Sequence, residues 1–146
     1  MILNLACTES HSLYKESFLL PDSGWSRETT LEGSWISEQS ISHSPITLAI
    51  THAPDFGYEN LYLTAKAMKN SQIVWTDTFS LQLAKHKFGQ WLGSQRGDFW
   101  IVTDTLPYSL SLEKGEEFQF QISQFSREDV LKGIEAVEIN VVQNLK

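Results

Sequence analysis

The stretch Phe118–Ser123, which reads FQFQIS, decides the fold of this chain. Its apolar residues Phe118, Phe120 and Ile122 alternate strictly with polar residues. Because successive side chains of a β-strand point to opposite faces, this period of two places the three apolar side chains on one face. The stretch therefore predicts a strand of a sheet that has one face in a core and the other in solvent.

Similar segments occur on both sides of this strand, separated by turn residues such as Pro21-Asp22-Ser23-Gly24. They are Leu13–Leu20, a short piece at Trp35 and Ile36, Ile46–His52, Asn60–Met68, Ile73–Leu83, Tyr108–Leu112 and Val137–Val141. About eight short strands joined by turns predict an all-β, antiparallel β-sandwich, jelly-roll-like in arrangement, with a closed barrel as the alternative. The residues that we expect to share its core are Leu61, Leu63, Phe79, Leu81, Phe118, Phe120 and Ile122.

One segment, Ser126–Lys132, departs from the period of two. Ser126 can cap the amides of a first helical turn, Asp129 lies three positions further on, and Gly133 can end the turn. We therefore expect one short helical turn near the C-terminus, between the last two strands.

The charge of the chain excludes one class of partner. The chain has 146 residues, the size of a single domain, and a formal net charge of −7. Neutralising nucleic-acid phosphates requires clustered Lys and Arg, and the sequence has no such cluster, so no nucleic-acid partner is expected. An acidic protein is also repelled by anionic surfaces, so attachment to a membrane must depend on something other than charge.

The sequence contains no motif for catalysis or for holding a cofactor. Its histidines, His11, His43, His52 and His86, do not lie at metal-ligand spacing with one another, with a cysteine or with a carboxylate. We expect all four to be ordinary surface or edge histidines. The sequence therefore predicts no catalytic, cofactor-binding or metal site, and a protein that is not an enzyme.

Four motifs occur in a distinctive order from about Tyr14 to Val142. They are Gly24-Trp25, Asn60-Leu61-Tyr62-Leu63, Gly89-Gln90-Trp91-Leu92-Gly93 followed by Gly97-Asp98, and the segment Gln124–Ile134, which reads QFSREDVLKGI. In this order and approximate spacing, the chain resembles the gliding-motility lipoprotein H (GldH) family of the Bacteroidota.

The resemblance implies a lipoprotein of the cell envelope that faces the periplasm and has no catalytic activity or cofactor. It implies a membrane lipid anchor and, as partners, other envelope proteins of the gliding motility machinery, which works alongside the type IX secretion system. Cys7 is the expected lipid attachment point. Residues 1–12 would then be the lipobox remnant and tether, and residues 13–146 the β-sandwich domain.

The lipobox itself is incomplete. Leu5-Ala6-Cys7 keeps the small residue before the cysteine, but Asn4 occupies the position where Leu is usual. The charged part of a signal peptide and most of its apolar part are not present before Cys7. Either the true start lies upstream of Met1, or this copy is not exported as written.

The two family-like loops, Trp91–Asp98 and Ser126–Gly133, together contain Trp, Arg and Asp residues. Trp and Arg often anchor interfaces. The possible partner surface predicted from them consists of Trp91, Arg96, Asp98, Arg127 and Asp129. The alternative is a polar network that locks the loops, in which Asp98 caps loop amides and Arg127 pairs with Asp98 or Glu128. Two rival functions also stay open: a carbohydrate-binding β-sandwich that uses exposed tryptophans, and a hydrolase with a site assembled from distant residues.

Overall fold

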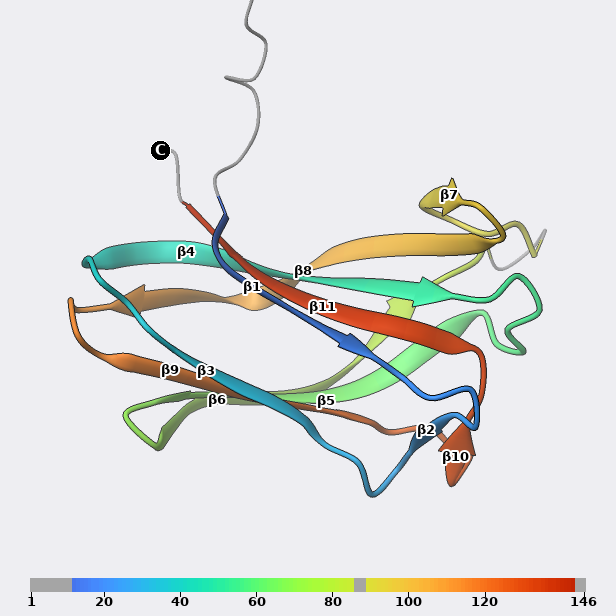
Figure 1. Ribbon diagram of the computed structural model, residues 1–146, viewed down its shortest axis with the longest axis horizontal. Helices are drawn as coiled ribbons and strands as arrows, with labels where there is room; N and C mark the ends of the chain where they lie inside the picture. The colour runs from blue at the N-terminus through green and yellow to red at the C-terminus, as the bar shows by residue number, and fades with distance from the viewer. Residues whose placement is uncertain (1–11, 86–88, 144–146) are drawn as a thin grey trace, which may run out of the picture.

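The computed structural model describes residues 12–85 and 89–143, and all regular structure in these two ranges is β. The larger sheet has the order β1-β11-β4-β8-β7, made of β1 (Ser12–Leu19), β11 (Ile134–Val142), β4 (Ile41–His52), β8 (Phe99–Leu112) and β7 (Ser94–Arg96). The second sheet has the order β3-β9-β5-β6, made of β3 (Leu31–Ile36), β9 (Glu117–Gln124), β5 (Asn60–Lys69) and β6 (Gln72–Gln82). Figure 1 shows these two sheets as stacked layers.

The long strands alternate between the two layers along the chain, except at the β5–β6 hairpin, and all the strand pairs are antiparallel. This interleaved order is jelly-roll-like. The two short strands β2 (Trp25–Ser26) and β10 (Val130–Leu131) pair with each other at one end of the sandwich. The described ranges contain eleven strands, where the sequence predicted about eight. The difference arises because β2, β7 and β10 have only two or three residues, too few to show a period of two.

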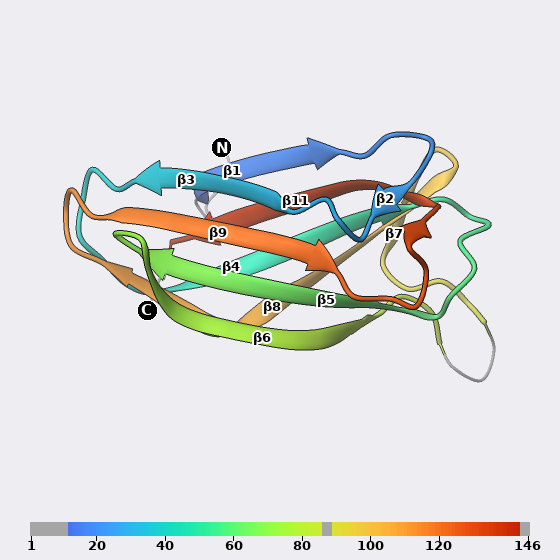
Figure 2. The same cartoon turned by 90° about the horizontal axis from the view of Figure 1, so that it is seen from below.

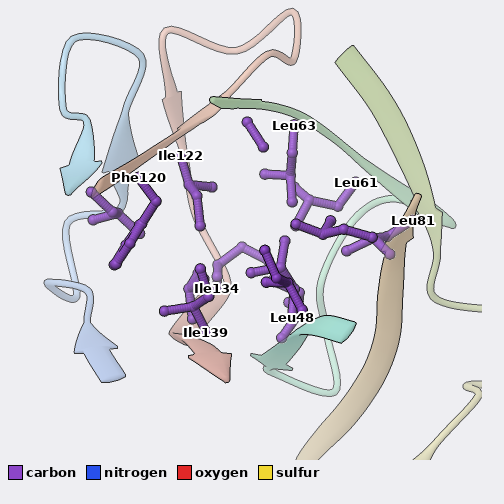
Figure 3. Packing of buried hydrophobic residues seen from close by; sticks show 14 of the residues in the cluster. Leu48, Leu61, Leu63, Leu81, Phe120, Ile122, Ile134 and Ile139 are labelled. Atoms are coloured by element: carbon purple, nitrogen blue, oxygen red, sulfur yellow. The ribbon is translucent and has the colours of Figure 1, made fainter. Parts of the chain in front are cut away.

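The core lies between the two sheets. Figure 3 shows Leu48, Ile134 and Ile139 of the larger sheet directed toward Leu61, Leu63, Leu81, Phe120 and Ile122 of the second sheet. Every residue predicted for the core is buried there except Phe79, which is half-buried and packs against the core from β6. Because β6 is the outermost strand of its sheet, it buries its side chains less completely.

The strand β9, which contains the stretch FQFQIS, confirms the alternation predicted from sequence. Phe118, Phe120, Ile122 and Gln124 are buried, while the residues between them are partly exposed. β9 pairs with β3 on one side and with β5 on the other, so its backbone hydrogen-bonding groups are used along both edges.

The helical turn predicted at Ser126–Lys132 is wrong. The Ser126 Oγ does accept a hydrogen bond from the Glu128 amide at 3.2 Å, but the chain then extends into β10. The Arg27 amide donates to the Asp129 carbonyl at 2.7 Å, and Val130 pairs with Ser26. Pairing with a distant strand therefore prevailed over the local capping pattern. No helix in the described ranges is long and apolar enough to cross a membrane.

Candidate functional site

Three segments meet at the end of the sandwich where β2 and β10 lie. They are the turn after β2, the loop from β4 to β5, and the segment that follows β9. Figure 1 shows β2 and β10 side by side at this end, and Figure 2 shows that β5 starts at the same end as β2. The Ala53 amide donates to the Gly133 carbonyl at 2.8 Å, which joins the second segment to the end of the third. Gly133 has a φ of +102°, and a Cβ there would lie 2.8 Å from the Phe56 ring, so this junction requires glycine.

Gln124 fixes the segment that follows β9. Its side chain is buried, and its Nε2 donates to the carbonyls of Trp25 at 3.2 Å and Glu128 at 3.0 Å. Its Oε1 accepts hydrogen bonds from the amide of Ser126 at 2.8 Å and from the Ser126 hydroxyl at 2.7 Å. A buried amide that uses both donors and its acceptor holds the surrounding backbone in one arrangement. Gln124 thus ties the third segment to β2.

These segments enclose a groove of about 800 Å³. Its floor is apolar and includes Leu61 and Leu131, which are buried. We call it the aromatic–arginine groove, because its walls are formed by Arg27, Tyr58, Tyr62, Phe125 and Arg127.

The rings of the groove stand out from the rest of the surface. Tyr58, Tyr62 and Phe125 are the aromatic residues that are largely exposed within residues 12–85 and 89–143, and all three line the groove. The other strongly exposed apolar residues of these ranges are aliphatic: Leu19, Ile36, Ile73, Val74 and Val130. An exposed aromatic ring does not contribute the large hydrophobic free energy that its burial would give. Three such rings in one hollow are therefore typical of a binding surface.

Both guanidinium groups of the groove are accessible to a ligand. The Arg27 side chain is 45% exposed, and its Nη1 lies 3.9 Å from Asp129 Oδ1, whose side chain is 95% exposed. An ion pair of this length between exposed groups is weak in water. Arg27 also donates to the Ser126 carbonyl. Arg127 is exposed and forms no ion pair with another residue of the described part of the chain.

The carboxylate of Glu128 is engaged within the groove. It accepts a hydrogen bond from the Tyr58 hydroxyl, and this bond is the main reason why the pKa of Tyr58 is raised above its usual value. The groove therefore presents ring faces, an apolar floor and two guanidinium groups. No cluster of three or more His, Cys, Asp or Glu able to hold a metal occurs among the residues that the structure describes.

Trp91, Arg96 and Asp98 lie outside the groove. Trp91 is half-buried, forms an isolated bridge with Ala84, and donates its indole N–H to the Pro54 carbonyl at 3.2 Å. Arg96 is exposed on β7, and Asp98 is exposed in the turn from β7 to β8. One of the family-like glycines in this loop has a steric cause: a Cβ on Gly93, where φ is +83°, would lie 2.0 Å from the Ile101 carbonyl oxygen.

His52 connects this loop to the groove through ring contacts. Its ring centroid lies 4.4 Å from that of Trp91 and 5.7 Å from that of Phe56, which in turn lies 5.8 Å from Tyr58. The expectation that all four histidines lie at the surface or an edge is wrong for His52, which is fully buried because it points inward from β4 between these rings. His43 is exposed, and His11 and His86 lie outside the described residues.

The buried imidazole of His52 is only partly satisfied. Nδ1 lies 2.9 Å from the Ala53 carbonyl oxygen, while Nε2 has no hydrogen-bond partner among the described residues. Burial lowers the pKa of His52, and the hydrogen bond to Ala53 opposes this effect. The neutral imidazole is therefore favoured.

The partner surface predicted from sequence is thus divided between two places. Arg127 lines the groove, and Asp129 lies beside it through its contact with Arg27. The predicted pairing of Arg127 with Asp98 or Glu128 does not occur among the described residues. The sequence reasoning missed Arg27, Tyr58, Tyr62 and Phe125. A signal existed for Tyr62, because the alternation in β5 already placed its ring on the solvent face.

Comparison with known proteins gives one family match. The family model described as GldH lipoprotein matches residues 12–141. No curated protein sequence is significantly similar to the chain. Cys7, the expected lipid attachment point, lies outside both the matched and the described residues.

Several solved structures align with most of the chain at low identity. A family 35 carbohydrate-binding module from Clostridium thermocellum is 9% identical, over 90% of this chain and 95% of that chain, with a TM-score of 0.37. Latent PorU from Porphyromonas gingivalis is 13% identical, over 92% of this chain and 13% of that chain, with a TM-score of 0.36. These values are too low to carry an argument about what the chain binds.

Proposed function

The chain belongs to the GldH lipoprotein family, and from this premise we propose that it is a non-catalytic accessory component of the bacterial gliding motility machinery. In this proposal the protein is anchored to a membrane of the cell envelope by a lipid, faces the periplasm, and acts by binding other envelope proteins of the machinery. The aromatic–arginine groove is the binding site.

The observation that carries this proposal is the composition of the groove. Its walls combine all the largely exposed aromatic side chains of the described ranges with two arginines. Tyr and Arg are enriched among the residues that dominate binding energy at protein interfaces, because each combines a broad contact area with polar specificity. A hollow with an apolar floor lets such residues seat a partner side chain away from water.

The position of the first strand also supports an anchor upstream of it. β1 starts at Ser12 and runs toward the groove end of the sandwich (Figure 2). Four residues separate Cys7 from Ser12. A lipid on Cys7 would therefore hold the start of β1 near the membrane and leave the groove directed away from it.

The experiment compares two exposed apolar residues at opposite ends of the sandwich. Phe125 in the groove is 61% exposed and Ile36 at the end of β3 is 59% exposed. Phe125→Ser and Ile36→Ser would each be introduced into a strain that lacks the gene. We expect Ile36→Ser to restore motility and Phe125→Ser to fail, with melting temperatures within about 2 °C of the parent protein. Motility restored by Phe125→Ser would contradict the groove as the binding site.

A second variant pair tests the rest of the surface predicted from sequence. Arg96→Gln changes the exposed arginine on β7, and Arg127→Gln changes one in the groove. If Trp91, Arg96 and Asp98 extend the partner surface, both variants reduce motility. If the groove acts alone, only Arg127→Gln does.

The lipid anchor has its own test. Cells would be labelled with a fatty acid, and the protein isolated from the parent strain and from a Cys7→Ser strain. We expect label in the parent protein and none in Cys7→Ser. Label that persists in the variant would exclude Cys7 as the attachment point.

A carbohydrate-binding function is the second candidate, because three exposed rings can also stack on sugars. It predicts that purified protein binds envelope polysaccharide and that Phe125→Ser abolishes this binding. Polysaccharide binding that survives Phe125→Ser would not be assigned to the groove.

A further inference from the structure

The charge of the groove is opposite to that of the chain. The chain has 18 acidic and 11 basic residues, and Arg27, Arg96 and Arg127 are its three arginines. Two of the three line the groove, although they come from opposite ends of the sequence. The fold therefore concentrates guanidinium groups in one hollow of an otherwise acidic protein.

The acidic residues of the same segment offset this charge only in part, because the lining has two guanidinium groups and one carboxylate. Glu128 is the carboxylate that lines the groove, and it is held by the Tyr58 hydroxyl. Among the described residues, the Asp129 carboxylate forms an ion pair with Arg27 alone, at 3.9 Å and with its own side chain 95% exposed. A guanidinium group binds a carboxylate through two parallel hydrogen bonds, so a better-placed carboxylate from a ligand would displace so weak a contact.

The polar groups that could bind sugar hydroxyls are mostly engaged within the protein. Gln124 and Ser126 are hydrogen-bonded to each other and to the backbone. The Asn60 amide lies 3.4 Å from the Tyr62 hydroxyl. What the groove offers to a ligand is therefore the faces of rings, an apolar floor and two cations, which suit a peptide better than a neutral glycan.

From these observations we infer that the groove binds an acidic peptide segment of a partner protein, in which a carboxylate side chain is adjacent to an apolar or aromatic one. The carboxylate binds Arg27 and Arg127, and the apolar side chain lies over Leu61 and Leu131 between the exposed rings. This inference rests on the proposed function, since it names the chemistry of the partner that the groove would take.

The test starts from a random peptide library displayed on phage. The library would be selected on the immobilised domain and depleted on the Arg27→Gln/Arg127→Gln double variant, whose melting curve is first matched to the parent. We expect the enriched peptides to combine Asp or Glu with an adjacent Phe, Tyr, Trp or Leu. No enrichment, or enriched peptides without acidic residues, would overturn the inference.

The best enriched peptide would then be synthesised with a fluorophore and its Kd measured by anisotropy. Losing a charge-assisted hydrogen bond weakens binding about tenfold or more, so Arg127→Gln should raise Kd by at least about tenfold. Arg96→Gln is the matched control: it removes the same charge outside the groove and should leave Kd within about twofold. Equal increases in Kd for the two variants would mean that binding depends only on the net charge of the protein, and would overturn the inference.

Two further probes test whether the groove prefers an anionic ligand that is not a peptide. They are an oligogalacturonate, which has carboxylates but no peptide, and vesicles containing phosphatidylglycerol. Either one competing with the peptide at a lower concentration than the unlabelled peptide itself would overturn a peptide partner.

The motility assay keeps the two proposals apart. If Phe125→Ser abolishes motility but the selected peptides are not acidic, the proposed function stands and this inference fails. If acidic peptides bind the groove and Phe125→Ser still restores motility, the peptide chemistry stands and the proposed function fails.

Discussion

The two ends of the sandwich are closed in different ways. At the end opposite the groove, the turns between β3 and β4, β5 and β6, and β8 and β9 bind one another through polar groups. The Ser37 amide donates to the Glu116 carbonyl at 3.2 Å, and the Glu117 amide donates to Asn70 Oδ1 at 3.0 Å. At the groove end, Gln124 and Arg27 tie the segments together through hydrogen bonds to backbone carbonyls, and the walls of the groove still leave rings and guanidinium groups exposed.

This difference separates stability from binding. Polar groups that satisfy one another hold the turns in place but leave little for a ligand to pair with. Exposed rings and cations contribute little to folding, yet they are the groups that a partner can use. Substitutions at the polar end should therefore affect stability, and substitutions in the walls of the groove should affect function.

The largest effect is expected in the core that both ends share. Phe120 is 2% exposed, and its ring centroid lies 5.9 Å from that of Phe118 and 6.0 Å from that of Phe18. Phe120→Ala should lower the free energy of unfolding by about 3–5 kcal/mol, measured by denaturant titration. Amide hydrogen exchange should then accelerate at both ends together. Faster exchange at one end alone would show that the ends do not depend on a common core.

Gln124→Ala should have the next largest effect, and it should be confined to the groove end. The substitution leaves the hydrogen-bonding groups of Trp25, Ser126 and Glu128 without their partner, at a cost of about 1–3 kcal/mol. Hydrogen exchange should accelerate in β2 and β10 but not in the turns of the opposite end. Gln121→Ala, on the exposed face of the same strand, is the control and should change stability by less than about 0.5 kcal/mol.

Asn70→Ala should destabilise the opposite end by about 1–2 kcal/mol while leaving motility intact. The residue has a φ of +49°, a conformation that Asn tolerates better than Ala, and its Oδ1 accepts the hydrogen bond from Glu117. Asn70→Gly separates the two causes, because glycine accepts the backbone conformation but loses the side-chain bond. Loss of motility in a well-folded Asn70 variant would break the division between the two ends.

The smallest effect concerns pH. Burial lowers the pKa of His52 in the folded protein below the value of an unfolded histidine, about 6.5. Below that pH the unfolded chain takes up a proton that the folded chain does not, so stability is lost as pH falls toward the folded-state pKa. Denaturant titrations at pH 7.5 and 5.5 should show a smaller acid loss for His52→Asn than for the parent protein. An equal loss in both would assign the pH dependence to other groups.

The sequence alone was enough for the sandwich because the alternation in β9 and β5 is a local property. Each such strand shows which of its faces is buried without reference to the rest of the chain. The short strand β10 could not be predicted in this way, since Val130 and Leu131 form a strand only because Ser26 and Trp25 lie beside them.

The groove depends on long-range contacts to a still greater degree. Arg127 was singled out from its motif, but nothing near Arg27 in the sequence indicates that it lines the same hollow. Phe125 lies just after a strand and Tyr58 lies in a loop, and a side chain at either place can be buried or exposed. Only the pairing of strands from distant parts of the chain brings these side chains together.

The pairing of β1 with β11 has a consequence for how the protein is made. β1 is the outermost strand of its sheet, and β11 is its hydrogen-bonded neighbour there. During synthesis the first strand therefore has no partner in this sheet until the last strand, ending at Val142, has left the ribosome. Contacts between such distant parts of a chain form slowly. β4 and β8 can pair earlier, so the edge of the larger sheet at β1 is the part that must wait for β11.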